Sequence, residues 1–121
     1  MSLPLRITAA FLLILIVVLG SVVPSLSPAS REGSDLWIHA TVYGGLVIAF
    51  AALFGSPALW AVFLFLFSVA VEGLQAFLPA RVASWSDIMA NAAGITTGLA
   101  LVGAIALTPL WSMITSRLRT A

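Results

Sequence analysis

The sequence predicts an all-α protein, a four-helix transmembrane bundle, from its composition and from the spacing of its charged residues. Of the 121 residues, 62% are hydrophobic and only 7% are charged, whereas a soluble domain carries about 25% charged residues. Long uncharged segments are separated by short stretches rich in proline, serine and glycine. We therefore expect a single membrane domain over residues 1–121. Because cysteine is absent, disulfides and thiolate chemistry are excluded.

The first helix is expected over residues 4–23. No charged residue occurs from Ile7 to Val23, and the stretch PSLSPASREGS that follows is typical of a loop. An alternative interpretation makes residues 1–30 a cleaved signal peptide, with Arg6 as its basic region. The uncharged run of 17 residues is longer than the usual apolar core of a signal peptide, which favours a membrane helix.

The second and third helices share one long uncharged segment. Residues 36–71 carry no formal charge, which is too long for a single crossing that needs about 20 helical residues. The motif FGSP at residues 54–57 divides the segment, so we expect helices over residues 35–54 and 57–78. Proline at the start of the third helix is acceptable because the first turn does not need its missing N–H group.

The fourth helix is expected over residues 87–108, after the loop sequence LPARVASWSD. Pro109 ends or kinks this helix, because proline lacks the backbone N–H group that a helix interior requires. A short basic tail remains, residues 109–121, with Arg117 and Arg119.

The aromatic and basic residues predict how these helices cross the membrane. Indole side chains favour the membrane boundary, and all four tryptophans fall at predicted helix ends: Trp37, Trp60, Trp85 and Trp111. Arg6, Arg117 and Arg119 lie on one side of the predicted bundle, whereas Arg31 and Arg81 lie on the other. Because cytoplasmic loops carry the excess of basic residues, we expect the N- and C-termini to be cytoplasmic.

Two of the predicted helices begin with similar sequences. SDLWIHA at residues 34–40 and SDIMANA at residues 86–92 share serine, aspartate and alanine, with related residues at two further positions. Helices that start alike on the same side suggest a parallel repeat, as in some transporters. On the face of Asn91, Gly94 and Gly98 form a G-x-x-x-G pair, which is typical of closely packed membrane helices.

Polar residues are expected to gather in the half of the bundle opposite the termini. They are Asp35, His39 and Tyr43 on the second helix, Glu72 and Gln75 on the third, Arg81 in the loop, and Asp87 and Asn91 on the fourth. Residues three or four apart share a helix face. An ionisable residue at the centre of a membrane helix costs about 2.5–3.5 kcal/mol on insertion scales. We therefore expect Glu72 to pair with Arg81 and Asp35 to pair with His39.

Each of these residues also has a structural interpretation. Asp35 and Asp87 each follow a serine at a helix start, so they can serve as helix caps that complement the dipole. His39 can hydrogen-bond a neighbouring helix, as single polar residues often do in membranes. Tyr43 is expected to pack with its hydroxyl satisfied, and Gln75 and Asn91, taken singly, are expected to be structural rather than catalytic.

The chemistry of these residues leaves the cofactor undetermined. No G-x-S-x-G, P-loop, H-E-x-x-H or EF-hand pattern occurs. Asp35, His39, Glu72 and Asp87 could hold a hard metal ion, but their spacing matches no strong ligand motif. Helix N-termini near Arg81 could instead hold an anion such as a lipid phosphate, although the capping aspartates oppose this. The net charge of +1 gives no indication of a nucleic-acid partner.

The segments SDLWIHATVYGGL and VEGLQAFLPARVASWSDIMANAAGITTG resemble the VanZ-like family of small bacterial membrane proteins. The family pattern is an Asp, a His four residues on and a Tyr four further, then Glu-x-x-Gln, an arginine loop, and Asp-x-x-x-Asn before glycines. The resemblance covers residues 34–98. The family usually has a lysine after the first aspartate and a glycine before the arginine, where this chain has Leu36 and Ala80. Losing the lysine removes one charge that would favour an anion.

The resemblance implies a role at the cell envelope, in the bacterial cytoplasmic membrane. Some family members raise resistance to glycopeptide antibiotics, chiefly teicoplanin. The eight polar residues named above carry over as pattern positions without assigned chemical roles. We expect a polar pocket, open to the outer face, that binds or modifies an envelope lipid or lipid-linked precursor. Glu72 and His39 are the acid/base candidates of an enzyme, with Arg81 orienting an anionic head group.

The alternative is a non-catalytic interaction or assembly module, in which the polar cluster is structural and the glycines make an interface. Membrane lipids and a second copy of the chain are the expected partners. Transport is a weaker interpretation, because the polar residues occupy one half of the bundle and outline no path through it.

Overall fold

The computed structural model describes residues 1–23, 34–78 and 83–120; the side chains of Ser34, Asp35, Arg119 and Thr120 lie outside this description. The regular elements of the described residues are five helices: α1 (Leu3–Val22), α2 (Ser34–Phe54), α3 (Pro57–Gln75), α4 (Trp85–Ala106) and α5 (Pro109–Thr120). The first four are long and apolar enough to span a membrane. The expected all-α class and four spans are confirmed, and the chain is a multi-pass membrane protein.

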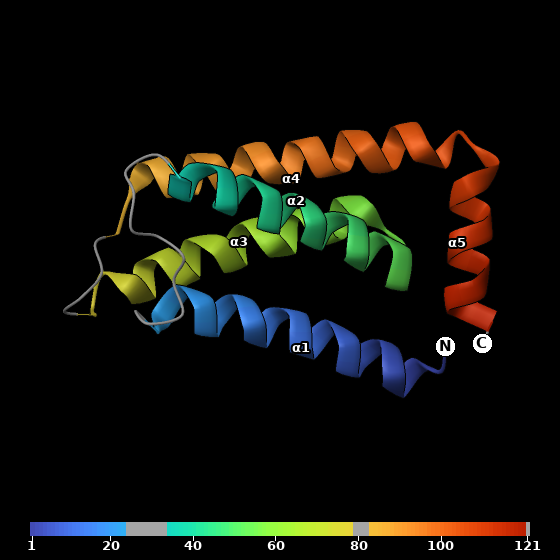
Figure 1. Ribbon diagram of the computed structural model, residues 1–121, viewed down its shortest axis with the longest axis horizontal. Helices are drawn as coiled ribbons and strands as arrows, with labels where there is room; N and C mark the ends of the chain where they lie inside the picture. The colour runs from blue at the N-terminus through green and yellow to red at the C-terminus, as the bar shows by residue number, and fades with distance from the viewer. Residues whose placement is uncertain (24–33, 79–82, 121) are drawn as a thin grey trace.

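The four long helices lie side by side along the long axis of the molecule (Figure 1). α2 and α4 start at one end and run in the same direction, as their similar first residues predict, whereas α1 and α3 run in the opposite direction. We call the end where α2 and α4 start the loop end. Both chain termini lie at the opposite end, the terminal end. The termini therefore share a side of the membrane; its assignment to the cytoplasm stays a prediction.

Several helix boundaries differ from those expected, and one further helix appears. α3 ends at Gln75 instead of residue 78, because the next residues tighten into a turn in which the N–H groups of Phe77 and Leu78 donate three residues back. α4 begins at Trp85, two residues early. The basic tail, to which the sequence assigned no structure, forms α5. Pro109 begins this helix, where its missing N–H group is not required, and α5 then crosses the terminal end of the bundle (Figure 1).

The turn between α2 and α3 is short and made of residues with unusual backbone angles. Gly55 and Ser56 have φ values of 78° and 50°, in the left-handed region that glycine adopts without strain. The Gly55 N–H group donates to the Ala51 carbonyl at 2.8 Å, which closes α2. Trp60 packs edge-on against Phe50, with ring centroids 4.9 Å apart. Trp60 therefore lies at a helix end, as predicted, but inside an aromatic cluster.

The backbones of α2 and α4 touch directly, which confirms the predicted close packing at Gly94 and Gly98. A Cβ atom on Gly94 would overlap the Ala40 carbonyl oxygen, and one on Gly98 would lie 2.6 Å from the Gly44 carbonyl oxygen. Small residues four apart on both helices thus form one seam, the arrangement that lets membrane helices approach most closely. We call Ala40, Gly44, Gly94 and Gly98 the α2–α4 seam.

The core lies among α2, α3 and α4, whereas α1 packs at its margin. Its fully buried aliphatic side chains include Val47 and Leu64. In α1 only Ala10 is buried, but each end of the helix is held by a hydrogen bond. Arg6 Nη1 donates to the Leu53 carbonyl at 3.1 Å near its start, and Gln75 Nε2 donates to the Ser21 carbonyl at 2.8 Å near its end.

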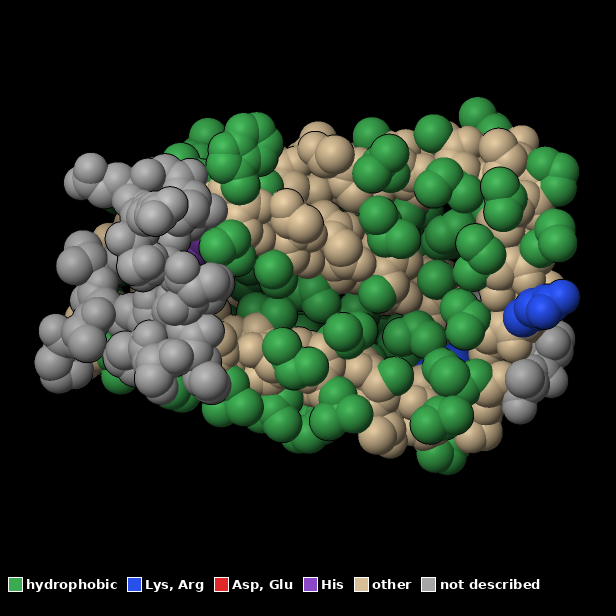
Figure 2. Space-filling model, viewed as in Figure 1, with side chains coloured by type: hydrophobic (Ala, Val, Ile, Leu, Met, Phe, Trp, Pro, Cys, Tyr) green, Lys and Arg blue, Asp and Glu red, His purple; other side chains and the backbone are tan. Residues whose placement is uncertain are grey.

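The outer surface matches a membrane environment. Figure 2 shows hydrophobic side chains spread along the length of the bundle; among the side chains described on this face, the basic ones lie toward the terminal end. Acidic side chains do not appear on this face. The described carboxylates, Glu72 and Asp87, belong to the α3 and α4 segments at the loop end.

Candidate functional site

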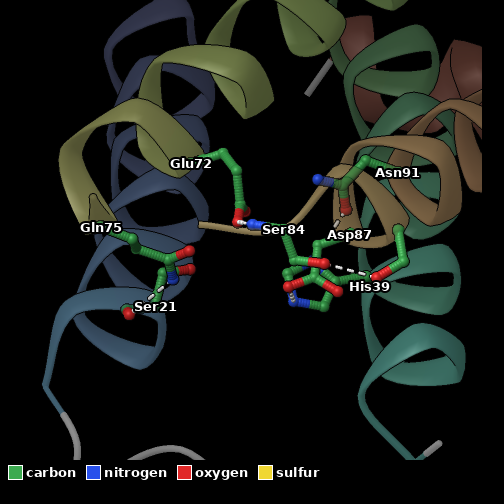
Figure 3. Close-up of polar contacts among 8 residues, drawn as sticks. Ser21, His39, Glu72, Gln75, Ser84, Asp87 and Asn91 are labelled. Carbon is green, nitrogen blue, oxygen red and sulfur yellow. Dashed lines mark hydrogen bonds and ion pairs between the residues drawn. The ribbon is translucent and has the colours of Figure 1, made fainter. Parts of the chain in front are cut away.

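Polar side chains from three helices meet at the loop end of the bundle (Figure 3). Glu72, Gln75 and Asn91 are all buried, with exposed fractions of 3%, 6% and 1%. Burying polar groups is costly unless they are hydrogen-bonded. Their partners therefore decide what this region can do.

His39 on α2 contacts two residues of α4. Its Nδ1 lies 2.9 Å from Oδ1 of Asn91; because an amide oxygen only accepts, Nδ1 is the donor of this bond. Its Nε2 lies 3.8 Å from Oδ2 of Asp87, an ion pair when the ring is protonated. The imidazole is thus held at one nitrogen and faces a carboxylate with the other.

The α2–α4 seam explains why these side chains meet. Ala40, which contacts Gly94, directly follows His39, and Asn91 lies three residues before Gly94. Two backbones in direct contact bring the side chains of the next turn within hydrogen-bond range. His39 and Asn91 also occupy the same position of the two similar helix starts, so the repeat places equivalent residues opposite each other.

Glu72 on α3 holds the start of α4. Its Oε1 accepts a hydrogen bond of 2.5 Å from the backbone N–H group of Ser84, the N-cap residue of α4. A carboxylate at this position also complements the positive end of the helix dipole. Glu72, Asp87, His39 and Asn91 thus lie together around the start of α4 (Figure 3). We call Glu72, Asp87, His39 and Asn91 the polar cluster.

Two predicted pairings involve residues outside the described part of the chain. Arg81 lies there entirely, as does the side chain of Asp35, so the pairs of Glu72 with Arg81 and of Asp35 with His39 stay predictions. The structure adds partners that were not expected, Asp87 for His39 and the Ser84 backbone for Glu72.

Gln75 and Tyr43 make their contacts outside the polar cluster: Gln75 bonds α1, and Tyr43 packs against an aromatic ring. Gln75 points toward α1 (Figure 3), where it donates to the Ser21 carbonyl. Tyr43 is 3% exposed, and its ring lies 6.5 Å from that of Phe67. Among the predicted site residues that the structure describes, these two are placed for packing and helix attachment.

Comparison with protein families gives the protein its class. A model of the VanZ/LLP1 family matches residues 6–106. The chain belongs to the VanZ/LLP1 family. The match runs from the first turn of α1 to the last residue of α4 and contains the whole polar cluster. No curated protein and no solved structure matches the chain.

The VanZ/LLP1 chain also uses residues that sequence reasoning missed. Ser84 begins the pattern Ser-x-x-Asp with Asp87, a signature of helix starts that would have placed the N-cap correctly. Ser21 contributes only its carbonyl, and no side-chain pattern identifies such an acceptor. Ser68 is 1% exposed and donates to the Phe65 carbonyl of its own helix, so its hydroxyl is satisfied locally.

In the described part of this VanZ/LLP1 protein, no three His, Asp or Glu residues are grouped so as to hold a metal ion. The polar cluster offers instead a carboxylate and an imidazole that reach the surface. The side chains of His39 and Asp87 are 22% and 19% exposed, whereas Glu72 and Asn91 are buried behind them. This arrangement can bind a polar group at His39 and Asp87 while the buried residues fix their positions.

A shallow, open apolar groove of about 290 Å³ lies between α3 and α4. It is lined by Val62, Phe65 and Leu66 of α3 and by Ala92, Ile95 and Thr96 of α4. Ala92 directly follows Asn91 in the sequence, so one end of the groove is close to the cluster. The walls can accept a hydrocarbon chain without desolvating polar groups.

Proposed function

We propose that this VanZ/LLP1 protein binds an envelope lipid or lipid-linked precursor at the outer face of the bacterial cytoplasmic membrane. The observation that carries the proposal is the partial exposure of His39 and Asp87 in front of buried, hydrogen-bonded Glu72 and Asn91. Ionisable residues within membrane helices are expensive and usually functional.

The charges of the cluster select the kind of head group. The Asp87 carboxylate faces the His39 ring and is partly exposed, so the described part of the site favours donors such as hydroxyl, amide and ammonium groups. A lipid-linked sugar or peptide precursor carries such donors. An anionic head group would require Arg81 as its counter-charge.

The apolar groove supports a lipid rather than a water-soluble ligand. Its α4 wall begins next to Asn91, so a hydrocarbon chain in the groove would leave its head group near the polar cluster. Binding is the function that this geometry supports best, because the Glu72 carboxylate is already engaged by the Ser84 N–H group. The acid/base roles of Glu72 and His39 stay predictions.

The second candidate is the non-catalytic assembly module. It is favoured by the internal bonding of the cluster, since Glu72 and Asn91 are satisfied within the chain and fix the register of α2, α3 and α4. In this case partners would bind elsewhere, and changes in the cluster would act through stability alone.

Native mass spectrometry of the purified protein separates these functions. Asp87→Asn removes the exposed charge and keeps a side chain of the same shape, and Thr97→Val is the control, because Thr97 is exposed and bonds only its own helix in the structure. We expect Asp87→Asn to weaken retention of a co-purified lipid or precursor about tenfold, since hydrogen bonds to charged groups contribute about 1.5–3 kcal/mol. Thr97→Val should retain it fully.

Thermal unfolding of the same variants gives the contrary outcome. If Asp87→Asn retained wild-type lipid but unfolded at a lower temperature, the cluster would be structural and the assembly module would be the better function. Melting is therefore recorded on the samples used for lipid analysis.

A cellular readout follows from the family. We propose that expression of the wild-type chain in a susceptible bacterium raises tolerance to teicoplanin and that Asp87→Asn abolishes this effect. Equal tolerance of cells with and without the protein would separate this chain from the resistance-linked members.

A further inference from the structure

A second polar feature lies at the terminal end, far from the polar cluster. Arg6, in the first turns of α1, packs against the end of α2, where Nη1 donates to the Leu53 carbonyl. Its Nε is buried and has no hydrogen-bond partner among the described residues. A donor of a charged group left without an acceptor costs about 1–3 kcal/mol or more, so this position favours a ligand that can accept from Arg6.

The charge of Arg6 is not balanced within the described structure. The Leu53 carbonyl belongs to the negative end of the α2 dipole, which explains the Nη1 bond but supplies no formal charge. The carboxylates of Glu72 and Asp87 are at the loop end. The described charged side chains of the terminal end are therefore basic, and Figure 2 shows basic side chains toward that end.

α5 adds a surface suited to the membrane boundary at the same end. It crosses the end of the bundle (Figure 1) and contacts α2 and α4. Leu110, Met113 and Ile114 are exposed on one face of α5, and Arg117 is exposed one turn further along that face. An apolar face edged by a basic residue is typical of a helix lying in the plane of the lipid head groups.

The geometry points to binding of anionic phospholipid head groups at the terminal end, where Arg6 and Arg117 supply the positive charge and α5 lies in the head-group layer. The lipid phosphate neutralises Arg6, and a small movement of that side chain gives the Nε–H group an acceptor. Arg forks match phosphate oxygens better than point charges do. Leu110, Met113 and Ile114 insert among the acyl chains beside the head group.

This site is independent of the function proposed for the polar cluster, because the two occupy opposite ends of the bundle. It also selects the opposite ligand charge, since the loop end presents carboxylates and the terminal end presents guanidinium groups. Variants at one end should leave binding at the other unchanged, so the failure of one proposal does not decide the other.

The test is titration of the purified full-length protein with phosphatidylglycerol or phosphatidylcholine carrying the same acyl chains, followed by native mass spectrometry. The variants are Arg6→Gln and Arg117→Gln, each of which removes one positive charge and keeps a polar side chain. Thr97→Val is the control, because Thr97 is exposed and bonds the Ala93 carbonyl of its own helix. Each lost arginine should weaken phosphatidylglycerol binding about fivefold, since a basic residue near an anionic surface contributes about 1 kcal/mol. The control should bind like wild type.

Three results would overturn the proposal. The first is equal binding of the two lipids by the wild-type protein. The second is wild-type phosphatidylglycerol affinity in both single variants. If Arg6→Gln does not fold, wild-type affinity in Arg117→Gln alone is sufficient. The third is displacement of phosphatidylglycerol by excess inorganic phosphate, which would identify free phosphate instead of a lipid as the ligand.

Discussion

His39 and Asn91 occupy the same position in two similar helix starts and hydrogen-bond each other, with 2.9 Å between Nδ1 and Oδ1. Their helices run in parallel and touch at the α2–α4 seam. A repeat of helix starts has thus become a pair of facing residues, in which one copy carries an ionisable ring and the other a neutral amide. Because the two side chains differ, the hydrogen bond between them has one direction, from His39 Nδ1 to Asn91 Oδ1.

A double-mutant cycle should detect this bond. We expect His39→Ala and Asn91→Ala each to destabilise the protein, with a coupling of about 0.6 kcal/mol and at most about 1.7 kcal/mol, the range found between membrane helices. Unfolding in a mixed detergent series measures it. Thr96→Val serves as the control, because Thr96 is exposed and bonds the Ala92 carbonyl of its own helix. Strictly additive effects of the two alanines would contradict a direct bond.

The α2–α4 seam should tolerate no added methyl group at Gly94. Gly94→Ala places a Cβ atom against the Ala40 backbone, and we expect a loss of about 1–3 kcal/mol in unfolding free energy, the usual cost of overpacking. Gly103→Ala on the same helix has nothing within 4 Å of the new Cβ atom. This control should be neutral or more stable by up to about 1 kcal/mol, since alanine favours helix. Equal melting of the two variants would refute the close contact.

Glu72 should act as an acceptor for the start of α4 whether or not it is charged. Glu72→Gln keeps an oxygen that can accept from the Ser84 N–H group, whereas Glu72→Ala removes it. Hydrogen exchange at residues 84–88 is therefore expected to rise about tenfold in Glu72→Ala, for a lost bond of about 1.5 kcal/mol, and less in Glu72→Gln. Unchanged exchange in the alanine variant would show that Ser84 is held by other contacts.

The C-terminal end of α1 should depend on Gln75. In Gln75→Leu the Ser21 carbonyl loses its side-chain donor, so we predict faster hydrogen exchange in the last turn of α1 with little change in α4. Few buried residues hold α1 otherwise, since Ala10 alone is buried within it. Leu74→Val, an exposed neighbour, is the control. Equal exchange in both variants would count against this attachment.

Cysteine labelling can place the two ends of the bundle relative to the membrane. The chain has no cysteine, and Ser2, Ser56 and Ala83 are exposed, so single cysteines can be introduced at each. We expect Ser2→Cys and Ser56→Cys to react with an impermeant reagent only after the cells are opened, because both precede helices that start at the terminal end. Ala83→Cys should react in intact cells. The reverse pattern would invert the predicted topology.

The spans could be predicted well because their signal is local. Uncharged segments of membrane-crossing length and the FGSP turn were sufficient to place α1 to α4 within a few residues. α5 was missed because Pro109 marks the end of one helix and the start of another equally well. Its orientation across the bundle follows from contacts with α2 and α4, which no local pattern contains.

The sequence by itself determined the family, the four apolar spans, the face of each helix that carries polar residues, and the glycine pair of α4. These properties follow from composition and from the helical period, both of which are readable along one chain. Only the tertiary structure decided the partners: Asn91 and Asp87 for His39, the Ser84 backbone for Glu72, and α1 for Gln75. A helical period fixes which side a residue faces, but the close approach at the α2–α4 seam decides what it meets there.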